Sequence, residues 1–179
     1  MTQTQPAVHR AARGAVESAP EQQGQYLTFN LCGDMYAIGI LHIKEILEYG
    51  QLTAVPMMPE LIRGVINLRG AVVPVIDLGS RFGGDRGEVT KRTCIVIIEV
   101  TAQDGKQDIG VVVDSVSEVL EISVTEIEPP PAFGARIRAD FIEGMGKING
   151  KFVIILDVDK VLSVDEIVRL GAMDGEMAP

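Results

Sequence analysis

The sequence places few reactive residues at the spacings that catalysis or ligand binding requires. Gly150-Lys151 comes nearest to a phosphate-binding loop, but that motif needs a glycine and a serine or threonine where the chain has Met145 and Phe152. Gly144-x-Gly146 lies in a strand-turn-strand pattern with no helix after it, which argues against a dinucleotide site. Neither glycine motif therefore predicts nucleotide binding.

The histidines and cysteines are equally isolated. The chain has two histidines, His9 near the N-terminus and His42, and its two cysteines, Cys32 and Cys94, lack C-x-x-C spacing. These residues offer too few partners to form a catalytic triad or a metal site. We therefore predict a protein that is not an enzyme and that holds no metal and no cofactor, with His42 an ordinary residue at the edge of a loop.

Composition and charge narrow the class of protein. Val and Ile number 21 and 19, against 5 Phe, 3 Tyr and no Trp, and such β-branched residues favour strands. The formal net charge of −9 argues against a nucleic-acid partner and against docking on an anionic membrane. No apolar run reaches the length of a membrane-spanning helix and no signal peptide is recognisable, so we expect a cytoplasmic protein without direct membrane insertion.

Short apolar runs separated by turn residues predict an all-β fold after a polar tail. Residues 1–24 are expected to be a disordered N-terminal tail. Residues 79–92 are expected to form a loop, and a short closing helix is expected after Ser163, which has capping-box spacing to Glu166. Strands are predicted at 26–31, 35–40, 43–55 (kinked near Gly50), 64–68, 71–77, 94–100, 108–113, 117–122, 141–148 and 152–157.

An internal repeat organises these strands. Residues 64–77 align with 144–157 at a constant offset of 80, and two glycines and a final aspartate coincide. Residues 38–40 similarly echo 109–111, and 43–47 echo 116–120. Each half thus reads as a hairpin, a kinked strand, a proline loop and a glycine-hinged hairpin, and five short strands in each half favour closure into two linked barrels. The repeat-related Asp77 and Asp157 are expected to cap the turn after each strand rather than to form a catalytic pair.

Surface recognition is the chemistry that remains. Ile43 and Glu45 lie two residues apart, on one face of a predicted strand. Arg69 lies at a predicted hairpin tip. By itself, Ile43 fits a core residue and Arg69 fits a solvated hairpin charge. Taken together with Glu45, they resemble an apolar contact flanked by charges at an interface. Spacing alone leaves both interpretations open.

At these residues the chain resembles the CheW family, the adaptor of bacterial chemotaxis. The matching run is Pro-Glu-Leu-Ile-Arg-Gly-Val-Ile-Asn-Leu-Arg-Gly at 59–70, continuing through Val-Pro-Val-Ile-Asp-Leu at 73–78. Supporting matches lie at 38–46 and 110–120, and the resemblance covers about 25–170. It implies two linked five-stranded SH3-like barrel subdomains over 25–170, with a flexible C-terminus at 171–179.

The resemblance also implies partners and a site. Family members couple the cytoplasmic tips of transmembrane chemoreceptors (methyl-accepting chemotaxis proteins) to the regulatory domain of the histidine kinase CheA, without catalysis of their own. By position, Ile43, Glu45 and Arg69 match residues of the receptor-binding groove between the subdomains, and Val119 matches a further position tied to receptor contact. The family implies apolar kinase contacts at the ends of the subdomains, but it does not assign them to residues of this chain. The expected location is the cytoplasm, with recruitment to receptor arrays at the membrane.

Two other classes of function remain open at this stage. One is a CheW-like scaffold of a non-flagellar pathway, such as surface motility, which only the identity of the partners would separate. The other is an enzyme or a small-ligand sensor on the same β-barrel scaffold, because a fold does not fix a function.

Overall fold

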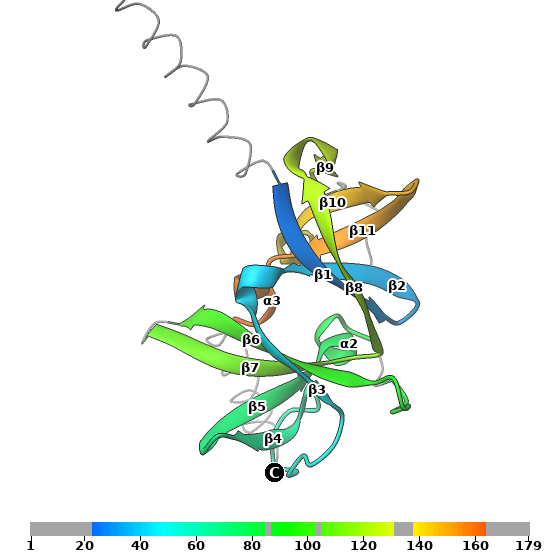
Figure 1. The fold of residues 1–179 in the computed structure, drawn as a ribbon. Coiled ribbons are helices and arrows are strands. Elements are labelled where there is room, and N and C mark those ends of the chain that lie inside the picture. The colour runs from blue at the N-terminus through cyan, green and yellow to red at the C-terminus, as the bar shows by residue number, and fades with distance from the viewer. Residues whose placement is uncertain (1–22, 85–86, 103–104, 131–137, 164–179) are drawn as a thin grey trace, which may run out of the picture.

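The computed structural model describes residues 23–84, 87–102, 105–130 and 138–163 (Figure 1). Most of the predicted tail, the helix expected after Ser163 and the C-terminus at 171–179 lie outside this part of the chain. Strand β1 begins at Gln23, so the last two residues assigned to the tail belong to a strand.

Most predicted strands are confirmed. The described strands are β1 (Gln23–Leu31), β2 (Asp34–Gly39), β3 (Ile43–Glu48), β4 (Ile62–Leu68), β5 (Ala71–Asp77), β6 (Cys94–Ala102), β7 (Gly105–Val113), β8 (Ser115–Ser123), β9 (Ile127–Glu128), β10 (Ile142–Ile148) and β11 (Lys151–Leu156). Short helical segments join them: η2 (Ile40–His42), α2 (Leu78–Arg81), η3 (Val124–Glu126), η4 (Ala139–Phe141) and α3 (Val158–Val161).

Among the boundaries that differ from the sequence prediction, two have a clear cause in the structure. The strand predicted over 43–55 ends at Glu48, because Gly50 and Gln51 have φ angles of +156° and +58° that no regular ladder accommodates. Only Thr53 pairs again, in an isolated bridge to Val65. The loop predicted over 79–92 begins inside helix α2, because the Asp77 side chain accepts a hydrogen bond from the Ser80 N–H and so caps the helix.

The two sheets do not correspond to the two halves of the repeat. One sheet has the order β8-β1-β2-β11-β10-β9 and the other has the order β3-β6-β7-β5-β4. Each half therefore contributes its first hairpin to the other half's sheet, where β2 runs parallel to β11 and β7 runs parallel to β5. The expectation that each half closes on itself is wrong, although two all-β subdomains of similar topology are confirmed (Figure 1).

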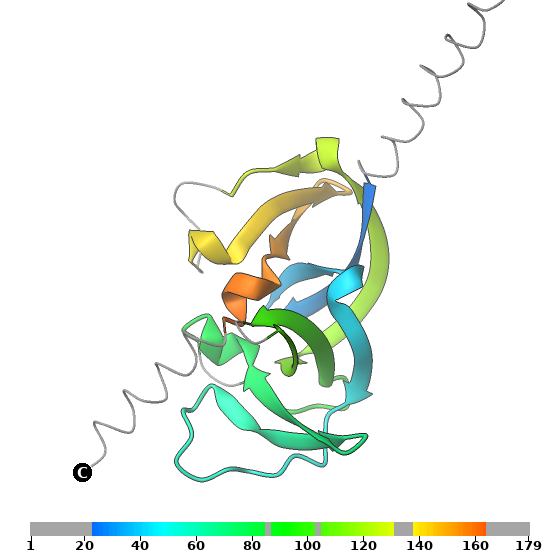
Figure 2. The same cartoon turned by 90° about the vertical axis from the view of Figure 1, so that its left-hand side faces the viewer.

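This exchange makes one continuous core across the two subdomains. The largest buried cluster combines side chains of both sheets, among them Phe29 and Tyr36 from the first and Val96 and Val111 from the second. One smaller cluster fills the interior of each subdomain. Figure 2 shows α2 and α3 together at the junction, where the Arg81 Nε donates a hydrogen bond of 2.6 Å to the Val161 carbonyl. The shared core fixes how the two subdomains sit against each other.

Candidate functional site

The hairpin between β4 and β5 holds Arg69 in an unfavourable backbone conformation. Arg69 and Gly70 have φ angles of +54° and +86°, the combination of a type I′ turn. The Asn67 side chain supports the turn by accepting a hydrogen bond of 2.9 Å from the Gly70 N–H. The repeat-related turn has Asn149 at the same place, a residue that tolerates this region far better than arginine does. An arginine at such a position points to a role for its side chain.

Arg69 forms an ion pair with Glu45 of strand β3. The Arg69 Nη2 lies 2.8 Å from the Glu45 Oε1, and the Arg69 side chain is 75% exposed while that of Glu45 is 26% exposed. The second carboxylate oxygen of Glu45 is buried and has no hydrogen-bond partner among the described residues. The pair therefore presents an exposed guanidinium over a carboxylate whose hydrogen bonding is incomplete.

Ile43 and Glu45 lie on opposite faces of the sheet, because Ile43 pairs with Ile98 of β6 and Glu45 pairs with the next residue, Ile97. Exposure alternates along the strand, with Ile43 and Glu45 half-buried and Lys44 and Ile46 exposed. Ile43 also packs against the core cluster shared by the two subdomains. A bulge between Ile43 and Glu45 bends the strand here, because the register to β6 shifts at this point. The predicted common face of Ile43 and Glu45 is therefore wrong: Ile43 is turned toward the cluster shared by the two subdomains, whereas Glu45 lies opposite Ile97, which belongs to a smaller cluster.

Val119 lies in the other subdomain, on strand β8, and its surface is 49% exposed. It pairs with Leu27 of β1, next to a bulge. There the buried hydroxyl of Thr28 donates to the Glu118 carbonyl at 2.8 Å and accepts from the Glu118 N–H at 3.2 Å. Strands β3 and β8 are edge strands of their respective sheets. The structure thus joins Glu45 to Arg69 and places Val119 on the pseudo-equivalent edge of the other subdomain.

A buried ion pair next to this hairpin was not predicted from the sequence. The Arg63 Nη2 lies 2.6 Å from the Asp77 Oδ2, with the side chains only 9% and 4% exposed. Arg63 also donates to the Tyr49 hydroxyl at 3.1 Å and to the Gly87 carbonyl at 3.3 Å. Burial alone would lower the pKa of Arg63, but the hydrogen bonds to Asp77 and Tyr49 outweigh burial and raise this pKa. The ion pair thus anchors β4 to the start of α2.

The other half of the repeat replaces this arginine with an acid. Residue 143, at the offset of 80 from Arg63, is Glu143, and both residues occupy a bulge in their hairpin. The repeat, aligned one residue further toward the N-terminus, would have revealed this difference. Burial and the charge of Asp157 raise the pKa of Glu143, against an opposing influence of His42. Asp157 does cap α3 as predicted, by accepting a hydrogen bond of 3.3 Å from the Lys160 N–H.

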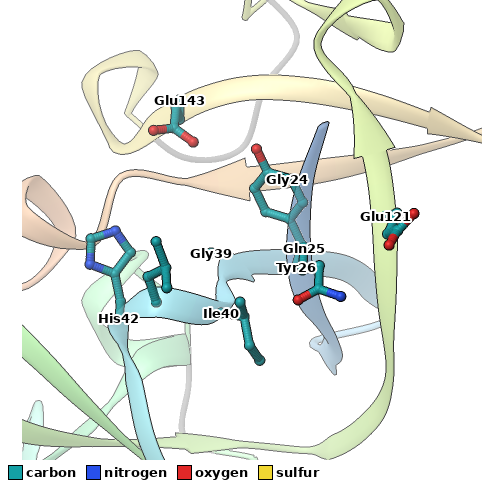
Figure 3. A pocket seen from close by; sticks show the side chains of 9 residues that line it. Gly24, Gln25, Tyr26, Gly39, Ile40, His42, Glu121 and Glu143 are labelled. Atoms are coloured by element: carbon teal, nitrogen blue, oxygen red, sulfur yellow. The ribbon is translucent and has the colours of Figure 1, made fainter. Parts of the chain in front are cut away.

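Glu143 lines a cleft of about 550 Å³. Figure 3 shows the Tyr26 ring rising from β1 with its hydroxyl turned toward β10, which carries Glu143. His42 of η2 lies at another side of the cleft, and Glu121 lies across it on β8 (Figure 3). The exposed Leu41 of η2 also lines the cleft. Burial raises the pKa of Tyr26, and the charge of Glu143 raises it further. His42, interpreted from the sequence as an ordinary loop-edge residue, is thus part of a cleft wall.

Comparison with known proteins identifies the class of protein. The family model of the CheW-like domain matches residues 25–166. The chain is 35% identical over 150 residues to the chemotaxis protein CheW of Klebsiella aerogenes, which covers 83% of this chain and 88% of the relative. It is 30% identical over 169 residues to the chemotaxis protein CheW of Treponema pallidum, covering 91% of this chain and 94% of the relative.

A solved structure agrees with the sequence relatives. The scaffolding protein TtCheW from Thermoanaerobacter tengcongensis matches with a TM-score of 0.70 and 36% identity, over 77% of this chain and 86% of that protein. This chain belongs to the CheW family. It is a chemotaxis adaptor and scaffold built from two SH3-like subdomains, in a family whose members are non-catalytic adaptors.

Neither a metal-site cluster nor a membrane-spanning helix is present among the described residues. Within residues 23–84, 87–102, 105–130 and 138–163, no three or more His, Cys, Asp or Glu side chains are grouped as a metal site would require. In that same part of the chain, no helix has the length and apolar character needed to cross a membrane.

Proposed function

We propose that this chain couples the cytoplasmic tip of a transmembrane chemoreceptor to the regulatory domain of the histidine kinase CheA, and that it works in the cytoplasm at membrane receptor arrays. The receptor-binding residues would be Ile43, Glu45, Arg69 and Val119. The observation that carries this proposal is the ion pair between Glu45 and Arg69. Arg69 of this pair lies in a hairpin turn whose backbone is less favourable than it would be with the asparagine of the sister hairpin.

The chemistry and exposure of these residues indicate a different role in receptor binding for the apolar residues and for the charged pair. Ile43 and Val119 offer apolar contact on the edge strands of the two subdomains, and such contact supplies affinity to a helical partner. The Glu45–Arg69 pair would set register and specificity, because partly exposed charges mainly steer and discriminate. The exposed guanidinium still has donors for an acidic side chain of the receptor, and the uncompensated oxygen of Glu45 would accept from a donor nearby.

The kinase contacts would use a second pair of surfaces. Val72 and Phe152 are repeat-related residues on the outer faces of the two glycine-hinged hairpins, and they are 71% and 52% exposed. Large exposed apolar side chains at equivalent positions of two subdomains suit end-to-end association with a protein of the same fold. We assign one kinase contact to each of them.

Co-sedimentation with a receptor cytoplasmic fragment and CheA tests the proposal, with ATP turnover by the kinase measured in parallel. The unmodified chain should form the ternary complex and raise kinase activity. Arg69→Ala should fold normally and lose receptor binding by roughly tenfold or more, because a charge at a turn contributes little to stability. Phe152→Glu should weaken kinase binding and leave receptor binding unchanged. Retention of full receptor binding by folded Arg69→Ala would refute the assigned role of Arg69.

The alternative of a CheW-like scaffold in a non-flagellar pathway rests on one comparison. The chain is 30% identical over 150 residues to protein FrzA of Myxococcus xanthus, covering 83% of this chain and 89% of the relative. The same site would then recognise the receptors of another pathway. Co-sedimentation with receptors and kinases of each pathway separates the two alternatives.

A further inference from the structure

The cleft between β1, η2, β8 and β10 contains an acidic site that lacks the counter-charge present in the sister half of the molecule. In the first half, the bulge residue of the hairpin is Arg63, and its guanidinium neutralises the capping Asp77. In the second half, the bulge residue is Glu143, which stands near the capping Asp157 and raises the local negative charge. The same backbone frame therefore holds a cation in one subdomain and an acid in the other.

The walls of the cleft suit a cation with an apolar stem. The Tyr26 ring lies over Gly24, whose missing side chain makes room for it, since a Cβ there would lie 3.0 Å from the ring. The Tyr26 hydroxyl points toward the strand that carries Glu143 (Figure 3). Ile40 and the almost fully exposed Leu41 supply apolar surface beside these polar groups. An aromatic face, an acid and aliphatic surface together match an arginine or lysine side chain.

We propose that this cleft binds an arginine or lysine side chain of a protein partner, with Glu143 as the carboxylate that receives it and Tyr26 as the aromatic wall. The guanidinium or ammonium group would occupy the place that Arg63 fills in the sister subdomain. The residues of η2 continue directly into strand β3, which carries Ile43 and Glu45, so the cleft wall adjoins the proposed receptor-binding strand along the chain. The identity of that partner rests on the proposed function, whereas the cation site does not.

Titration of the full-length protein with Nα-acetyl-arginine methylamide, followed by backbone amide NMR shifts, tests the site directly. The matched control ligand is the citrulline analogue, which has the same shape and no charge. We expect saturable shifts at 24–26, 39–42 and around Glu143 with the arginine analogue in the millimolar range, and none with citrulline. Equal shifts from the two ligands, or none from either, would overturn the proposal.

Two variants with equal loss of charge separate the cleft from general electrostatics. Glu143→Gln should weaken binding of the arginine analogue by roughly tenfold, as expected for loss of one charge-assisted contact. Glu126→Gln, on the exposed η3 of the same subdomain, should leave the affinity unchanged. Glu143→Arg should abolish the site, because the introduced guanidinium would take the place beside Asp157. Unchanged binding in either Glu143 variant contradicts the assignment.

Two further variant experiments identify the source of the arginine or lysine side chain. Arg69→Ala should lose the receptor and still bind the arginine analogue, so failure of the receptor proposal and failure of the cleft proposal give different results. The N-terminal segment precedes β1 and carries Arg10 and Arg13. If the analogue binds only after Arg10→Gln and Arg13→Gln are introduced, the cleft is occupied by the chain itself, and a partner as the source of the cation is refuted.

Discussion

The buried pair of Arg63 and Asp77 offers the sharpest test of how this fold is held together. Arg63→Met keeps much of the length and apolar surface of the side chain but leaves the Asp77 carboxylate buried without its cation. One oxygen of Asp77 still accepts from the Ser80 N–H, but the other loses two contacts of 2.6 and 2.7 Å to the guanidinium. Removing one partner of a buried ion pair costs about 3–5 kcal/mol of unfolding free energy.

This loss is large enough to measure in two ways. For a protein of this size, each kcal/mol shifts Tm by about 2–4 °C, so Arg63→Met should lower Tm by roughly 6–20 °C. Urea denaturation followed by circular dichroism at pH 7 should show the midpoint falling at an unchanged m-value. Lys106→Met serves as the control, because its ion pair with Glu99 joins a lysine that is 72% exposed to a partly exposed acid at 3.5 Å. That change should cost less than about 0.5 kcal/mol.

A double-mutant cycle separates the uncompensated charge from lost packing. Asp77→Asn retains an oxygen to cap α2 and removes the negative charge. If the cost of Arg63→Met arises from the buried charge, the double variant should recover at least half of the lost stability. A cost below about 1 kcal/mol for Arg63→Met, or a double variant in which the two losses simply add, would refute this reasoning.

Three further changes test other parts of the structure. Val73→Asp places a charge in the interior of its subdomain, where Val73 is 2% exposed, and should unfold that subdomain; a soluble variant with a native amide NMR spectrum would show the strand facing to be wrong. Gly64→Ala puts a Cβ 2.5 Å from the Thr53 carbonyl and should cost more than about 2 kcal/mol in urea denaturation, against about 1 kcal/mol for Gly33→Ala, where the space is open. Glu143→Gln should raise Tm at pH 7 and have little effect in acid. Folding raises the pKa of Glu143, mainly through burial and then through Asp157. The charged Glu143 therefore destabilises the folded protein. This destabilisation is absent below the pKa of Glu143 in the unfolded chain and complete above its pKa in the folded protein. Tyr26 and His42 share this cleft, so Tm across that pH range should be compared with Tyr26→Phe and His42→Gln variants; a Tm gain that is the same at every pH would contradict the assignment to Glu143.

Local sequence signals predicted local structure well. Asn149-Gly150 predicts a tight turn, and the structure has φ angles of +51° and +80° there. Asp77 and Asp157 follow strands and cap the helices that come next, as the repeat indicated. Each of these features depends on residues within three or four positions of one another, where side chain and backbone chemistry act directly.

Contacts between distant residues were predicted less completely. The strand predicted over 43–55 is too long, because the pattern of apolar residues does not reveal the positive φ angles at Gly50 and Gln51. The family resemblance placed Glu45 and Arg69 in one groove without predicting a contact between them, and the structure joins β3 to the β4–β5 turn through their ion pair of 2.8 Å. Nothing in the spacing of Arg63 marked it as the buried partner of Asp77, because solvent exposure of an arginine depends on what packs around it.

The sequence by itself determined the all-β class, the two repeated halves, the turns, the capping aspartates and the family of adaptors to which the chain belongs. These properties reside in residue types and short spacings. Only the tertiary structure decided that each half gives its first hairpin to the other, that one core spans both subdomains, and that Arg63 is buried against Asp77. The physical reason is that hairpins form through neighbouring residues, whereas the parallel pairing of β2 with β11 and of β5 with β7 depends on which apolar surfaces are buried together once the whole chain has folded.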